Sequence, residues 1–108
     1  MTVNEYQKLA MRTLGDERNE RDMLTLAALG LCGESGEVSD LIKKYLYHGH
    51  ELKKDELIKE LGDVAWYLAE AATALNVPLE DIFIANIEKL KNRYPDGFSH
   101  ERSINRED

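Results

Sequence analysis

A repeat of apolar residues every three or four positions constrains the fold of this chain more than any other feature. The repeat runs through most of the 108 residues, whereas the alternation typical of strands is weak. Pro78 and Pro95 are the two prolines, and both stand where a periodic segment begins or stops. We therefore predict four helices, over residues 3–13, 22–47, 53–75 and 79–93. Short connections between four helices indicate an all-α, four-helix bundle-like subunit.

The length is that of one domain. We expect residues 1–98 to form a single helical domain and residues 99–108 to be a polar C-terminal tail that frays unless a ligand or another subunit orders it. Residues 15–21 are charged and are expected to form a loop, and His48-Gly49-His50 is expected to be a turn. Because a chain this small buries only a modest share of its surface, we also expect self-association.

The charge balance and the single cysteine limit the partners and the compartment. With 21 acidic and 14 basic residues the net charge is -7, so no basic stripe is available for a long nucleic acid. Cys32 excludes a disulfide within the chain and fits a reducing compartment, and we expect it to be a small buried residue. The chain shows neither a signal pattern near its start nor an apolar run approaching about 20 residues. These features predict a cytoplasmic protein without a membrane partner.

Two acidic residues lie on or beside the apolar face of the second predicted helix. Glu34 occupies a core position, because the positions that step by three or four around it are apolar or aromatic: Ala27, Leu31, Val38, Leu41 and Tyr45. Glu37 lies one turn further, at the edge of the same face. A carboxylate that points toward a core is costly unless it is paired.

The third predicted helix repeats this arrangement. Glu60 borders its apolar face and Asp63 lies one turn on, while the face itself consists of Leu57, Leu61, Val64, Ala65, Leu68, Ala72 and Leu75. Trp66 lies roughly opposite this face, which indicates a subunit interface first and a platform for a base second, whereas Tyr67 falls on the side of the acidic pair. Each helix thus offers two carboxylates at positions i and i+3, with Cβ atoms about 5–6 Å apart.

Four carboxylates on two packed helices favour a divalent metal site. Neighbouring helices pack about 8–10 Å apart, so side chains from both can reach a shared cation that relieves their repulsion. No Glu-x-x-His pairing accompanies the acids, which favours Mg²⁺ or Mn²⁺ over redox iron and argues against a di-iron oxidase. The alternative is that the acids reach solvent or pair with nearby lysines: Lys43, Lys44, Lys53 and Lys59.

Two glycines, Gly33 and Gly36, flank Glu34, although glycine inside a helix costs about 1 kcal/mol relative to alanine. They indicate close packing of a neighbouring helix or clearance for a ligand beside the carboxylates. Gly62 beside Asp63 repeats the feature.

Glu34-Ser35-Gly36-Glu37, followed by residues 38–59 and then Glu60-Leu61-Gly62-Asp63, resembles the ExxE…ExxD signature of the MazG-like nucleotide pyrophosphohydrolases, within the all-α NTP pyrophosphohydrolase superfamily. The surrounding segments agree: GLCGESGEVSDLIKKYLYHG, KELGDVAWYLAEAATALNVPLEDI and NIEKLKNRYPDGF. The resemblance covers residues 24–98 and is most specific at the four acids.

The resemblance implies that Glu34, Glu37, Glu60 and Asp63 are Mg²⁺ ligands, with Mn²⁺ possible, and that Asn86, Lys89 and Arg93 contact phosphates or sugar with Tyr94 beside them. It implies hydrolysis of (d)NTPs to (d)NMP and pyrophosphate, in dimers or tetramers with sites between subunits. Glu34 and Glu37 are both candidates for the residue that accepts the proton of the attacking water.

Tyr67 is the local candidate for the nucleotide pocket, because it lies on the side of Glu60 and Asp63. Without the resemblance, Lys89 and Arg93 are equally well explained as a solvated helix C-terminus. Two other functions remain open. One is a pyrophosphatase specific for dUTP or dCTP, and the other is a non-catalytic helical module that binds a partner.

Overall fold

The computed structural model describes residues 1–15 and 19–106. Within these residues the named elements are all α-helices. In chain order the helices are α1 (Val3–Met11), α2 (Glu20–Tyr47), α3 (Lys54–Ala74), α4 (Leu79–Arg93) and α5 (His100–Ile104). The predicted all-α class is confirmed, and the four predicted helices are present with ends shifted by two residues or fewer.

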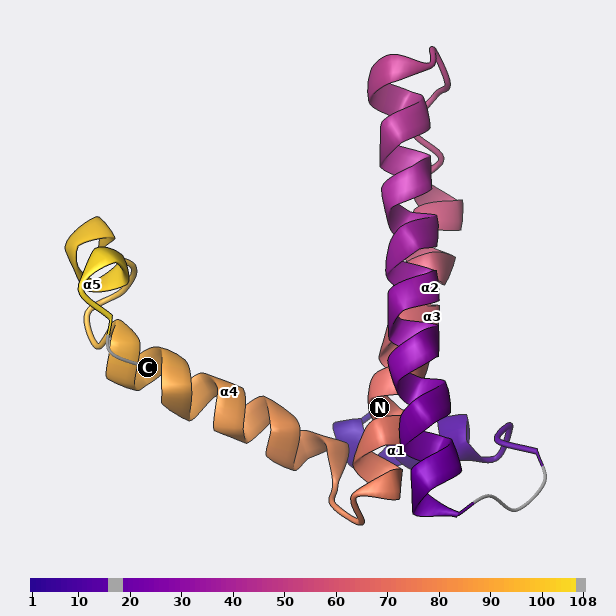
Figure 1. The fold of residues 1–108 in the computed structure, drawn as a ribbon, viewed down its shortest axis with the longest axis horizontal. Coiled ribbons are helices and arrows are strands. Elements are labelled where there is room, and N and C mark those ends of the chain that lie inside the picture. Colours follow the sequence, from indigo (N-terminus) through magenta and orange to yellow (C-terminus); the bar gives the residue numbers. More distant parts are fainter. Residues whose placement is uncertain (16–18, 107–108) are drawn as a thin grey trace.

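α2 and α3 form a long antiparallel hairpin that makes up most of the molecule (Figure 1). Residues 48–53 connect them and include the predicted turn at residues 48–50. Gly49 has a positive φ of 74°, and the backbone N–H of His50 donates to the carbonyl of Lys44. At the other end of α2 the side chain of Asn19 accepts a hydrogen bond of 2.8 Å from the backbone of Asp22, so Asn19 is the N-cap and α2 begins two residues earlier than predicted.

α1 packs across the base of the hairpin and is tied to the connection between α3 and α4. The Gln7 side chain donates to the Thr73 hydroxyl at 3.1 Å and to the Val77 carbonyl at 3.2 Å, and it accepts from the Leu79 backbone at 2.7 Å. The small core here consists of Ala69, Ala72 and Leu79, with side chains of α1 packed against it. These contacts hold the start of α4 against the hairpin.

α4 leads away from this base, so the structure is open (Figure 1). Its Cα radius of gyration is 17.0 Å, compared with about 13 Å for a compact chain of about 100 residues. One face of α4 carries large apolar side chains that are between 40% and 52% exposed: Phe83, Ile84, Ile87 and Leu90. The hairpin exposes others, among them Leu29, Ile58 and Leu61. Contiguous apolar surface of this kind is typical of a protein interface.

Three sequence-based expectations need correction. The polar tail does not fray throughout, because residues 100–104 form α5, which is capped by the Ser99 side chain. Cys32 is exposed rather than buried. The loop expected over residues 15–21 ends earlier than predicted, since α2 starts at Glu20, and residues 16–18 lie outside the described part of the chain.

None of the helices in the described residues combines the length and the apolar character that crossing a membrane requires.

Candidate metal centre

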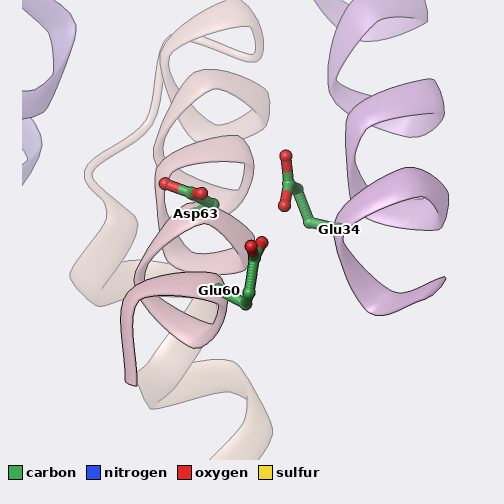
Figure 2. A group of neighbouring side chains, drawn as sticks. All are labelled: Glu34, Glu60 and Asp63. Atoms are coloured by element: carbon green, nitrogen blue, oxygen red, sulfur yellow. The ribbon is translucent and has the colours of Figure 1, made fainter. Parts of the chain in front are cut away.

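Glu34, Glu60 and Asp63 come together midway along the hairpin. Each offers a carboxylate oxygen that lies within 4.8 Å of the oxygens of the other two. Figure 2 shows Glu34 extending from α2 toward Glu60 on α3, with Asp63 one turn along α3. Glu34 and Glu60 are half-buried and Asp63 is exposed, so the group has a protected side and an open side.

The close approach changes the acidity of Glu60. Its pKa is raised, first because it hydrogen bonds with the Glu34 carboxyl and then because of desolvation and the negative charges nearby. The Oε2 atom of Glu34 is buried, and no hydrogen-bond partner for it exists among residues 1–15 and 19–106. A buried carboxylate oxygen without a donor is costly, so this arrangement needs a cation or a proton to stabilise it.

The donor set fits a hard divalent cation. All three groups are carboxylates, which Mg²⁺ and Mn²⁺ prefer as ligands, and the described residues bring no histidine or cysteine into the group. A cation shared by the three would satisfy the Glu34 Oε2 atom and offset the repulsion that raises the Glu60 pKa. Three of the four acids expected as ligands from the sequence thus lie close together, and their role as metal ligands stays a prediction.

Glu37, the fourth acid, is exposed and is not one of the three residues whose oxygens converge. It lies one turn beyond Glu34 on α2, and its charge contributes weakly to the raised pKa of Lys44, whose main cause is a hydrogen bond with Asp40. Two of the lysine partners considered for the acids, Lys43 and Lys44, form ion pairs with Asp40 instead.

A pocket of about 400 Å³ adjoins the carboxylates, lined by Thr13, Glu34, Asp63, Trp66 and Tyr67. The indole N–H of Trp66 donates to the Thr13 hydroxyl at 2.8 Å and to the carbonyl of Ala10 at 3.0 Å, which ties α1 to the pocket. The rings of Trp66 and Tyr67 meet edge to face with centroids 5.0 Å apart. Two fixed aromatic rings beside an acidic group offer a surface on which a base can stack.

The glycines of α2 and α3 near the acids differ in what surrounds them. A Cβ at Gly30 would overlap the Tyr67 ring, so Gly30 lets that ring approach α2 closely. At Gly33, Gly36 and Gly62 no described atom lies within 4 Å of an added Cβ. Close packing within one chain therefore does not explain the glycines beside the acids. Clearance for a ligand or for another subunit remains as the explanation.

The basic residues predicted to contact phosphate lie elsewhere. Asn86 and Lys89 are exposed along α4, and Arg93 and Tyr94 are half-buried at its end. α4 runs away from the hairpin (Figure 1), and within the described residues the pocket beside the carboxylates is lined by α2 and α3 side chains and by Thr13. One chain thus brings together the acids and Tyr67, but not the acids and the α4 residues.

Two residues of the pocket had no signal or a weak one in the sequence. Thr13 follows α1 and nothing in its neighbourhood marks it as a site residue. Trp66 was expected at a subunit interface first and as a platform for a base second, and it lines the pocket. Its position off the main apolar face of α3 was the only available signal.

Two comparisons of the sequence with known proteins give matches. The sequence profile of the MazG nucleotide pyrophosphohydrolase domain matches residues 23–98, which include both acidic pairs. A curated relative, "Gene 37 protein" of Mycobacterium phage L5, is 38% identical over 74 residues. The match covers 65% of this chain and 65% of the phage protein, so the shared segment spans less than two thirds of that relative. No solved structure matches.

Proposed function

The chain belongs to the MazG nucleotide pyrophosphohydrolase family, and on that basis we propose that it hydrolyses nucleoside triphosphates to a nucleoside monophosphate and pyrophosphate with Mg²⁺ as cofactor. The observation that supports this most is the convergence of three carboxylates from two helices beside an aromatic pocket. The proposal covers ribo- and deoxyribonucleotides and a cytoplasmic location, which the single cysteine fits.

Glu34, Glu60 and Asp63 are the residues that hold the cation in this proposal. When bound, Mg²⁺ supplies Lewis-acid chemistry: it neutralises phosphate charge and makes water a stronger acid. The half-buried carboxylates of Glu34 and Glu60 set one side of the site, and the exposed Asp63 carboxylate leaves the other side open to the triphosphate. Mn²⁺ has the same preference for oxygen ligands and is expected to substitute.

The chain's own residues position the substrate and move the proton. Water attacks the α-phosphorus, the bond from that phosphorus to the bridging oxygen of the β-phosphate breaks, and pyrophosphate leaves with the electron pair. We assign the proton of the attacking water to Glu37, because Glu34 is one of the three residues that would hold the cation whereas Glu37 is exposed one turn away and outside that group. Trp66 and Tyr67 provide the stacking surface for the base.

A second copy of the chain completes the site. Asn86, Lys89 and Arg93, with Tyr94 beside them, are proposed to contact the phosphates, yet α4 carries them away from the carboxylates of its own chain (Figure 1). The same helix exposes an apolar face that nothing in the described chain covers. A dimer, or a tetramer built from dimers, would bury that face and bring the basic residues of one subunit to the acids of the other.

The activity is tested with a panel of NTPs and dNTPs in Mg²⁺, scoring pyrophosphate against orthophosphate. We expect pyrophosphate as the first product, and at least a hundredfold loss in Asp63→Asn with little change in the matched control Asp55→Asn, which alters an exposed acid in the first turn of α3. Orthophosphate as the first product would contradict the cleavage position. A strong preference for dUTP or dCTP would identify a base-specific enzyme, and no turnover of any nucleotide would indicate a non-catalytic module.

The shared site is tested by mixing two inactive variants, Asp63→Asn and Lys89→Ala. Random reassociation into dimers restores about a quarter of the wild-type sites, because half of the dimers are mixed and each mixed dimer has one intact site. Recovery of activity on mixing is the expected result. If the mixture stays inactive under conditions where subunits exchange, the acids of one subunit and Lys89 of another do not act together.

A further inference from the structure

The turn that follows α1 forms one wall of the pocket beside the carboxylates, and the function proposed above gives this wall no role. Among the described residues that line the pocket, only Thr13 comes from outside α2 and α3. It lies two residues after α1 ends at Met11, and its backbone N–H donates to the Ala10 carbonyl at 3.1 Å. Because α1 crosses the base of the hairpin, this turn lies next to α3 (Figure 1).

The Thr13 hydroxyl links this turn to the indole ring of Trp66. The hydroxyl donates to the Ala10 carbonyl at 2.8 Å and accepts from the indole N–H at 2.8 Å, and the same N–H also reaches the Ala10 carbonyl at 3.0 Å. The three groups thus close a small ring of hydrogen bonds. An indole has one N–H donor and no acceptor, so its only polar group is bound within the chain.

Of the two acceptors of the indole N–H, the Thr13 hydroxyl is the more important. The Ala10 carbonyl receives the indole N–H, the Thr13 hydroxyl and the Thr13 backbone N–H, although a carbonyl oxygen has two lone pairs. Because three donors share this one oxygen, each of these bonds is weakened. The bond to Thr13 is also the shorter of the two indole bonds, so the hydroxyl is the main acceptor for Trp66.

This hydrogen bond determines how Trp66 lies and, through Trp66, affects Tyr67. A Trp side chain has two rotatable bonds, and a hydrogen bond at the edge of the ring restricts rotation about both. The Trp66 and Tyr67 rings meet edge to face at an interplanar angle of 83°, and the Tyr67 ring lies against Gly30 of α2. The pocket wall is therefore a series of contacts that runs from the end of α1 to α2, and the Thr13 hydroxyl is its first member.

Attachment of α1 to the rest of the chain does not need this hydroxyl. Gln7 hydrogen bonds with the α3–α4 connection, and Val3, Tyr6 and Ala10 pack against the small core. Thr13 is exposed, so an indole N–H that lost this partner would still have the Ala10 carbonyl or water. The contribution that belongs to the hydroxyl alone is the orientation of a ring that lines the pocket.

We infer that Thr13 is a positioning residue for the nucleotide: its hydroxyl holds the Trp66 ring in the orientation in which the base stacks on it. The inference rests on the proposed function, because it assigns a residue to the base pocket of that same site. Loss of one hydrogen bond of this kind corresponds to a change in affinity of about three- to tenfold. The loss concerns the base and not the cation, since the converging carboxylates are carried by α2 and α3.

The first test compares the kinetics of Thr13→Val with those of the wild type in Mg²⁺. We expect KM for a nucleoside triphosphate to rise about three- to tenfold while kcat changes less than about twofold. Inhibition by inorganic tripolyphosphate, which has the phosphates without base or sugar, should be unchanged. Thr13→Ser keeps the hydroxyl and should have the wild-type KM. The matched control is Thr25→Val, which removes an exposed hydroxyl that donates to the Arg21 carbonyl outside the pocket and should leave KM unchanged.

The second test needs no hydrolysis. Trp66 is the one tryptophan of the sequence, so tryptophan fluorescence reports on this ring alone. A nucleoside triphosphate with a methylene group between its α- and β-phosphates cannot be cleaved there, and it should quench the wild-type fluorescence by stacking on the ring. Thr13→Val should need about three- to tenfold more of this analogue for half-maximal quenching, whereas Thr13→Ser and Thr25→Val should match the wild type.

The inference is overturned if Thr13→Val has the KM and the quenching curve of the wild type, or if the analogue binds by calorimetry without changing the Trp66 fluorescence. Equal weakening of nucleotide and tripolyphosphate in Thr13→Val also contradicts it, because the effect would then not concern the base. A wild type that is quenched by the analogue but hydrolyses no nucleotide contradicts the proposed hydrolysis and leaves the role of Thr13 standing. Unchanged kinetics in Thr13→Val removes that role and leaves the hydrolysis standing.

Discussion

Glu34 occupies a core position on α2 and also contacts an acidic residue of α3. It stands in an apolar row, which brings its carboxylate into the gap between the helices, and there it hydrogen bonds with Glu60. A shared proton or a shared cation can hold these carboxylates together, so the two compete for the site. At the residue scale the protein should therefore respond to Mg²⁺ through these side chains.

Magnesium should raise the melting temperature of the wild-type chain, because a ligand that binds only the folded state stabilises it by about 2.7 kcal/mol at a concentration of 100 times its Kd. Glu60→Gln should abolish this shift, yet in EDTA it should be at least as stable as wild type, since it removes a repulsive charge. Thermal unfolding with Mg²⁺ or EDTA measures both, with Glu51→Gln, an exposed loop residue, as the control. An unchanged Mg²⁺ shift in Glu60→Gln would exclude Glu60 as a ligand.

Glu37→Gln separates metal binding from proton transfer. Because Glu37 lies outside the converging group, we expect this variant to keep the Mg²⁺-dependent rise in melting temperature and to lose at least a hundredfold in turnover. Loss of both properties would instead make Glu37 a metal ligand, as the sequence resemblance implies. Full activity would remove Glu37 from the site altogether.

At the scale of elements, the pairing of α2 with α3 depends on side chains that interlock at particular positions. Gly30 leaves room for the Tyr67 ring, and this contact lies one turn from Glu34 and one turn from Asp63. It therefore helps to set which carboxylates meet. α1 contributes in a different way, because Gln7 and Trp66 hydrogen bond between α1 and the α3 region.

Gly30→Ala should destabilise the chain by about 1–2 kcal/mol, because the overlap with the Tyr67 ring outweighs the gain in helix propensity. Gly33→Ala is the matched comparison, since no described atom lies near the added methyl group, and it should stabilise the isolated chain by up to about 1 kcal/mol. Urea unfolding monitored by circular dichroism measures both. Equal effects of the two substitutions would contradict the role of Gly30.

Gln7→Ala should cost about 2–3 kcal/mol, because it removes three hydrogen bonds and leaves part-buried groups of the α3–α4 connection without partners. Lys8→Ala, on the exposed side of α1, should change the free energy of unfolding by less than about 0.5 kcal/mol. The same unfolding experiment compares them. A Gln7→Ala variant as stable as Lys8→Ala would show that α1 is not held by this side chain.

On the scale of the whole molecule, the chain exposes too much apolar surface for its size. Its radius of gyration of 17.0 Å and its exposed α4 face describe an extended chain with a small core. Few of the hydrophobic residues that the structure describes are buried: Met23, Ala27, Ala69, Ala72 and Leu79. Burial of the α4 face by another copy would supply the missing hydrophobic stabilisation.

Sedimentation equilibrium should give a mass of at least twice the 12.4 kDa of one chain. Ile87→Glu places a charge in the middle of the apolar α4 face and should shift the protein toward monomer and lower its activity. Glu88→Gln, next to it on the exposed side of α4, should leave the mass unchanged. A wild-type monomer at micromolar concentration would contradict the shared site.

Much of the fold follows from local patterns in this chain. The helices were predictable because periodicity, caps and turn residues act over a few positions, and α4 was assigned with the bounds that the structure has. The acidic residues were predictable as a group because Glu34 interrupts an apolar row. α5 was not, since a five-residue helix has too short a pattern to recognise, and its place depends on the Gly97 turn and the rings around it.

Contacts between distant segments supplied the rest. The sequence alone shows that α2 and α3 each carry an acidic pair. The register of α2 on α3 brings Glu34, Glu60 and Asp63 together and leaves Glu37 outside this group. The divergence of α4 likewise depends on where the helices are joined and packed. The reason is physical: periodicity is a property of neighbouring residues, whereas register is the sum of many weak contacts between residues far apart in the chain.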